Sequence, residues 1–115
     1  MDEKASKHVL VCGSPCYGNR DAIREILQKR IRYGDIVYTF RRDGACHLAE
    51  TWLRSRRIPC FALPLPKAIP KRQAVTLELV SVVDVVVLFG KEDDVSNYIF
   101  RLARLAKRRI VLVRE

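Results

Sequence analysis

The stretch VLVCGSPCYGNRDAI, residues 9–23, decides the fold. It continues an apolar run that starts at His8 and ends at Cys12, which is typical of a strand covered on both faces. Beyond the loop, apolar residues recur at helical spacing, and Asn19 stands where the N-cap of a helix over residues 21–32 is expected. The stretch therefore predicts a buried strand, a tight loop and an amphipathic helix in succession.

The same alternation continues to the end of the chain. Gly34 is predicted to stop the first helix, and Pro59 helps to end the second. Further strands are predicted over 36–40, 60–63, 84–89 and 110–113, and further helices over 45–56, 71–82 and 95–107. Five strands alternating with four helices predict an α/β protein, a Rossmann-like three-layer α/β/α sandwich. We expect a five-stranded parallel sheet of order 3-2-1-4-5.

The 115 residues suffice for one domain, over 8–115, after a flexible lead over 1–7. No apolar run reaches the roughly 18 to 20 residues that span a bilayer, and the lead lacks the apolar segment of a secretory signal. We therefore expect a cytoplasmic protein without membrane contact. Its four cysteines are expected to be reduced thiols, and their spacing lacks the paired units of a zinc site, so no metal is predicted.

The net charge of +9 points to anionic partners. Three basic clusters stand out: Arg41-Arg42, Arg54-Arg56-Arg57 and Lys107-Arg108-Arg109. If they share one face, they form a patch that binds nucleic acid or an acidic protein. The alternative is an ordinary solvated surface, because no known nucleic-acid-binding motif accompanies them.

Ligands of such sheets bind at the carboxyl edge, where the strand order reverses between the first and fourth strands. The loops there begin at Gly13 and Gly90. Gly13 permits close approach of the backbone, Ser14 offers a hydroxyl, and the first helix offers free N–H groups, which together suit an anion. A turn that only redirects the chain is the alternative. Because the loop matches neither the dinucleotide fingerprint nor the P-loop, no cofactor is predicted.

Three motifs together resemble the YspA-like branch of the SLOG superfamily, which includes DprA, the LOG phosphoribohydrolases and the lysine decarboxylase-like proteins. The first is Gly13-Ser14 with the aromatic Tyr17 and the capping Asn19. The second is the run GACHLAETW, residues 44–52, followed by Ile58-Pro59. The third is the strand VDVVVLF, residues 83–89, with the later helix segment RLAR at 101–104. The resemblance extends over most of the chain, from about residue 8 to residue 113.

This resemblance implies that the protein binds or senses a nucleotide or nucleotide-derived ligand at the carboxyl edge. The alternatives are an N-glycosidic hydrolase of nucleoside phosphates, or a scaffold that binds nucleic acid or protein through basic patches. Self-association is expected, because related Rossmann-like proteins commonly pair through helices. The residues expected to contact the ligand are Gly13, Ser14, Tyr17, Asn19, Gly44, Ala45, Cys46, His47, Gly90, Lys91 and Ser96.

The chain departs from the family pattern in the loop after the fourth strand. There the run EDDVS, residues 92–96, replaces the glycine-rich phosphate loop and retains only the Ser96 hydroxyl. Acidic side chains are expected to repel a phosphate by roughly 1 to 4 kcal/mol at 4 Å, which Lys91 partly offsets. Cys46 is the best candidate for a reactive thiol because a helix N-terminus lowers thiol pKa. His47 beside it is either a general base or a surface residue.

Overall fold

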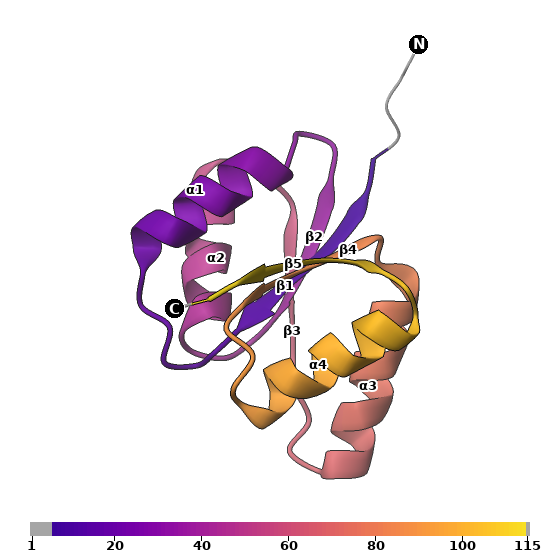
Figure 1. Cartoon of the computed structure of the whole chain (residues 1–115). Coiled ribbons are helices and arrows are strands. Elements are labelled where there is room, and N and C mark those ends of the chain that lie inside the picture. Colours follow the sequence, from indigo (N-terminus) through magenta and orange to yellow (C-terminus); the bar gives the residue numbers. More distant parts are fainter. Residues whose placement is uncertain (1–5, 115) are drawn as a thin grey trace.

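A computed structural model describes residues 6–114 of the chain (Figure 1). Residues 1–5 of the predicted lead lie outside this range. The elements are β1 (His8–Gly13), α1 (Arg20–Arg30), β2 (Ile36–Phe40), α2 (Ala45–Ser55), β3 (Cys60–Leu63), α3 (Ile69–Val82), β4 (Val85–Phe89), α4 (Asp94–Leu105) and β5 (Arg109–Val113). Among residues 6–114, no helix combines the length and apolar character needed to cross a bilayer.

The five strands form one parallel sheet of order β3-β2-β1-β4-β5, which confirms the predicted topology. Because β–α–β crossovers are right-handed, the two leftward steps of the chain and the two rightward steps place their helices on opposite faces. Figure 1 shows α1 and α2 against one face of the sheet and α3 and α4 against the other. The architecture is therefore the predicted three-layer sandwich.

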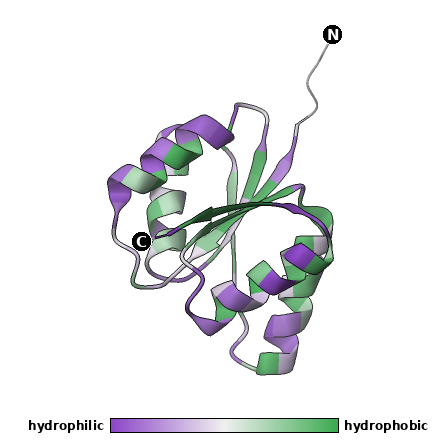
Figure 2. Cartoon of the chain, viewed as in Figure 1, coloured by the Kyte–Doolittle hydropathy of each residue, from purple (hydrophilic) through white to green (hydrophobic). Residues whose placement is uncertain are grey.

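Alternating side chains of the central strand divide the core in two. Val9 and Val11 of β1 pack in the cluster that α1 and α2 cover, whereas Leu10 and Cys12 pack in the cluster that α3 and α4 cover. All five residues of β4 are buried, as expected for a strand covered on both faces. Figure 2 shows the strands mainly in green and the helices divided between apolar and polar positions.

The start of α1 follows the prediction, but its end does not. The Asn19 Oδ1 atom accepts a hydrogen bond from the Ala22 N–H at 3.0 Å, so Asn19 is the predicted N-cap. Gly34 does not stop the helix, because α1 ends at Arg30 and Gly34 lies in the following turn with φ of +98°. That turn is closed by Asp35, whose carboxylate accepts the Arg32 N–H at 2.9 Å.

Two helices end in a left-handed residue that is not glycine. Arg57 follows α2 with φ of 59°, and Lys107 follows α4 with φ of 58°. In each case the next residue donates its N–H back to a helix carbonyl, Ile58 to Leu53 at 3.0 Å and Arg108 to Ala103 at 2.9 Å. These turns end both helices one or two residues earlier than the apolar periodicity predicts.

Candidate functional site

A cleft opens at the carboxyl edge of the sheet, where β1 and β4 lie side by side and the strand order reverses. It has a volume of about 480 Å³ and lies between the loop after β1, the loop after β4 and the end of β5. Its lining residues are Ser14, Cys16, Gly90, Lys91, Glu92, Leu112 and Arg114. This is the position at which doubly wound sheets bind their ligands.

The loop after β1 is held in place by its own backbone. The Ser14 N–H donates to the Phe89 carbonyl at 2.9 Å, which ties the loop to the end of β4. The Ser14 carbonyl accepts from the N–H groups of Tyr17 at 3.2 Å and Ala45 at 3.1 Å. The Ser14 hydroxyl accepts from the Cys16 N–H at 3.1 Å, so its own hydrogen remains available to donate into the cleft.

Two glycines permit this loop to pack directly on the start of α2. A Cβ atom at Gly13 would lie 2.4 Å from the Phe89 carbonyl oxygen and 2.8 Å from the Ala45 Cβ. Gly44 has φ of +77°, and a Cβ there would lie 2.3 Å from the Ser14 carbonyl oxygen. Both positions therefore require glycine for space, and Gly44 also requires it for backbone conformation.

The loop after β4 supplies charged groups to the opposite wall. Gly90 has φ of +86°, and its N–H donates to the Val113 carbonyl at 2.8 Å. The Lys91 Nζ atom lies 4.8 Å from the centre of the Phe100 ring, a cation–π contact. Glu92 accepts a hydrogen bond from the Lys91 N–H at 3.2 Å. With Arg114 from the other side, the cleft lining carries two basic groups and one carboxylate.

Asp93 does not face the cleft as a repelling charge, which corrects the expectation for that residue. Its Oδ2 atom accepts from Arg42 Nη2 at 2.8 Å and from the Ser96 N–H at 3.2 Å, so it caps α4 and forms an ion pair. The two side chains are only 13% and 20% exposed. Burial alone raises the pKa of Asp93, but the hydrogen bond and charge of Arg42 outweigh it and the pKa is lowered.

Two buried thiols lie within electrostatic reach of Arg42 in this ion pair. The Cys12 and Cys46 sulfur atoms are 3.4 Å apart. The hydrogen bond that Cys46 shares with the Cys12 thiol lowers the pKa of Cys46 to about 6, helped by Thr39 and by the charge of Arg42. The same contact, together with burial, raises the pKa of Cys12. The two thiols therefore titrate as a coupled pair, in which Cys46 gives up its proton more readily than Cys12.

The eleven residues expected to contact a ligand do not lie together. Ser14, Gly90 and Lys91 line the cleft. Asn19 caps α1, whereas Gly13, Gly44 and Ala45 shape the backbone behind the cleft. Three others are buried: Ser96, Cys46, and Tyr17, whose ring packs against Phe89 at 5.4 Å. His47 is exposed in a separate groove of about 400 Å³ between α1 and α2, beside Trp52.

Sequence reasoning missed two features of this edge. Arg114 was not selected, although its position directly after the last predicted strand places it at the carboxyl edge. The Arg42–Asp93 pair joins two loops whose residues lie 51 positions apart, so no local sequence pattern predicts it. Within residues 6–114, no group of three or more His, Cys, Asp or Glu side chains converges as a metal site.

Comparison with protein-family models and with curated proteins found no match for this chain. The likeness of its three motifs to the SLOG superfamily therefore remains a prediction from the sequence.

Proposed function

We propose that the protein binds a nucleotide or a nucleotide-derived anion in the cleft between Ser14 and Gly90. The observation that carries this proposal is the position of the cleft, at the carboxyl edge where the strand order reverses. Its volume of about 480 Å³ lies in the range of small-molecule sites. Lys91 and Arg114 offer two cations to a phosphate, and the Ser14 hydroxyl offers a hydrogen-bond donor.

The composition of the lining favours a ligand with both charged and uncharged parts. The charges lie on Lys91, Glu92 and Arg114, whereas Leu112 supplies apolar surface. A phosphate beside the basic groups leaves the sugar or base against Leu112 and the carboxylate of Glu92. Pairing of Asp93 with Arg42 supports this arrangement, because one negative charge of the acidic loop is already neutralised.

Thermal unfolding with nucleoside monophosphates, NAD, ADP-ribose and cyclic nucleotides tests the proposal. A ligand at 100 times its Kd stabilises the folded state by about 2.7 kcal/mol. We expect at least one member of the panel to raise Tm. We expect Lys91→Gln or Arg114→Gln to reduce that increase, each measured against the variant's own Tm without ligand. Lys71→Gln on α3 is the matched control and should leave the increase unchanged.

Absence of a shift with every member, or an equal shift in Lys91→Gln and Lys71→Gln, would contradict the proposal. The same incubations, assayed for free base, test the hydrolytic alternative. Glu92 is the carboxylate that lines the cleft, so base release that is lost in Glu92→Gln would replace binding with N-glycosidic hydrolysis.

A further inference from the structure

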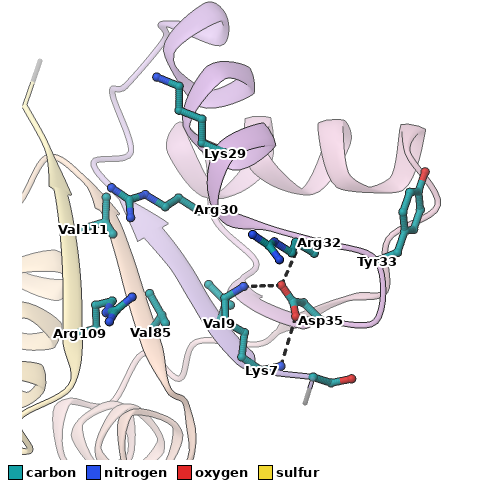
Figure 3. Close-up of a pocket in the computed structure, with 11 residues that line it drawn as sticks. Lys7, Val9, Lys29, Arg30, Arg32, Tyr33, Asp35, Val85, Arg109 and Val111 are labelled. Carbon is teal, nitrogen blue, oxygen red and sulfur yellow. Dashed lines mark hydrogen bonds and ion pairs between the residues drawn. The ribbon is translucent and has the colours of Figure 1, made fainter. Parts of the chain in front are cut away.

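A second pocket, of about 410 Å³, lies at the opposite, amino edge of the sheet (Figure 3). Its apolar lining residues are Val9, Val85 and Val111, of which Val9 is fully buried. Basic residues come to it from the start of β1, the end of α1, the following turn and the start of β5: Lys7, Lys29, Arg30, Arg32 and Arg109. Figure 3 shows the Arg30 side chain extending from the end of α1 over the strands.

A buried carboxylate, Asp35, holds the backbone and Lys7 at this pocket in place but does not neutralise the positive charge that the pocket presents to solvent. Asp35 accepts from Lys7 Nζ at 2.6 Å, from the Lys7 N–H at 3.2 Å and from the Arg32 N–H at 2.9 Å. Burial alone raises the pKa of Asp35. Its hydrogen bonds to Lys7 and Arg32 outweigh this effect, so the pKa is lowered and the carboxylate stays ionised. Its negative charge pairs with Lys7. The basic groups of α1, the turn and β5 are therefore not neutralised by Asp35 and face solvent.

In the part of the chain that the structure describes, the remaining arginines of the pocket have no acidic partner. Among residues 6–114, the side chains of Arg30, Arg32 and Arg109 form no ion pair, and all three residues are exposed. Lys29 has a long contact of 3.8 Å to Glu25, and both groups are exposed. Such a contact competes weakly with an external anion.

The pocket is part of a wider basic edge. Within residues 6–114, ten basic residues lie there, together with the acidic residues Asp35 and Asp84. Glu25 and Glu50, one helical turn further along α1 and α2, pair with Lys29 and Arg54 of this group. The ten are Lys7, Lys29, Arg30, Arg32, Arg54, Arg56, Arg57, Lys107, Arg108 and Arg109. Two of the three predicted basic clusters thus share one edge, and Arg41-Arg42 lies at the other. Basic residues are favourable at the C-termini of helices, which accounts for part of this set. It does not account for the position of Lys7, Arg32 and Arg109 at this edge, because these residues lie outside the helices.

An exposed aromatic ring accompanies these charges. Tyr33 lies in the turn after α1, between Arg32 and the loop that carries Arg56, and is 79% exposed. Figure 3 shows its ring beyond Arg32, on the side of the turn away from Arg30 and Arg109. A solvated tyrosine flanked by arginines is suited to stack on an unpaired base while the cations hold the phosphates.

We propose that this amino edge binds single-stranded nucleic acid. The phosphodiester backbone crosses the pocket over Arg30, Arg32 and Arg109, and one base stacks on Tyr33. An acidic protein segment is less well suited, because it has charge for the arginines but no flat ring for Tyr33. The site lies at the opposite edge from the proposed nucleotide cleft and does not depend on it.

Fluorescence anisotropy with labelled single-stranded oligo-dT and oligo-U tests the proposal. Affinity should fall with salt, with a slope of about −0.7 in log K against log salt for each phosphate contact. We expect Arg30→Gln and Arg109→Gln each to reduce that slope by about this amount. Tyr33→Ala should weaken binding roughly five- to 150-fold with an unchanged slope, because it removes stacking and no charge.

Arg101→Gln on α4 removes the same charge elsewhere and is the control. Equal weakening by Arg101→Gln and Arg30→Gln would show nonspecific charge attraction and would overturn the proposal. So would an unchanged affinity in Tyr33→Ala, equal binding of a duplex of the same length, or equally effective displacement by polyglutamate. Lys91→Gln should bind the oligonucleotides normally, so failure at one edge is distinguishable from failure at the other.

Discussion

The ion pair between Arg42 and Asp93 should contribute more to stability than a surface ion pair does. It joins the loop after β2 to the start of α4. Both side chains are largely buried: Arg42 is 13% exposed and Asp93 is 20% exposed. Hydrogen bonds to charged groups contribute about 1.5 to 3 kcal/mol. Replacing Arg42 by Ala also leaves the Asp93 carboxylate partly buried without its cation, so we expect a loss of about 2 to 3 kcal/mol.

A double-mutant cycle isolates the interaction. Asp93→Asn removes the charge but keeps an N-cap residue, because asparagine caps helices as well as aspartate does. Combined with Arg42→Ala, it should give a coupling free energy of about 1 to 3 kcal/mol in urea denaturation followed by circular dichroism. The matched control is the exposed pair Glu50–Arg54 on α2, 24% and 60% exposed, for which we expect about 0.3 to 0.5 kcal/mol.

Acid should abolish the coupling. The folded-state pKa of Asp93 is lower than its usual value, so the stabilisation is fully present above the unfolded pKa of about 3.9. It is lost as the pH falls through the lower folded value. A coupling no larger than that of Glu50–Arg54 at neutral pH would refute the reasoning, as would a coupling that persists after Asp93 is protonated.

Three further changes follow from local geometry. Gly44→Ala should lower the free energy of unfolding by about 3 kcal/mol or more, because the new Cβ overlaps the Ser14 carbonyl oxygen. Gly18→Ala, whose Cβ would have no atom within 4 Å, should change the free energy of unfolding by under about 0.5 kcal/mol. Similar losses in the two variants would contradict the overlap with Ser14. Lys107→Gly should raise the free energy of unfolding, measured in urea, by about 1 kcal/mol, because glycine adopts the positive φ without strain. Lys107→Ala keeps the strain, so an equal increase in that variant would show that the stabilisation has another cause. The ultraviolet absorbance of thiolate should show a step near pH 6 from Cys46, and Cys12→Ala should move it to higher pH; an unmoved step would mean that Cys12 does not stabilise the thiolate.

The fold was predictable because its signals are local and repeated. Each apolar run followed by an amphipathic helix predicts one β–α unit, and the handedness of crossovers leaves few sheet orders. The exceptions are helix ends such as Arg57 and Lys107, where a left-handed residue other than glycine ends the helix. Side-chain periodicity carries no information about that backbone conformation.

The candidate site was predictable only in part. Ser14 and Gly90 could be placed because they follow the two strands at the switch point. Tyr17 matches a motif position, but its ring packs against Phe89 in the core. Asp93 belongs to an acidic run, but its charge is paired with Arg42 from another loop. Direction and pairing of side chains depend on which loops meet in space, and a linear pattern does not record that.

The contact between Gly44 and the loop after β1 has a mechanical consequence. Because Ser14 is bonded to both Phe89 and Ala45, the first wall of the cleft moves as one body with the sheet and α2. On the opposite wall, among the described residues 6–114, the Lys91 N–H bonds only to its neighbour Glu92. Lys91 and Glu92 lie between the anchored Gly90 and the capped start of α4. We therefore expect adjustment to the proposed ligand to be concentrated in Lys91 and Glu92, so that ligands of different size would be accommodated from that side.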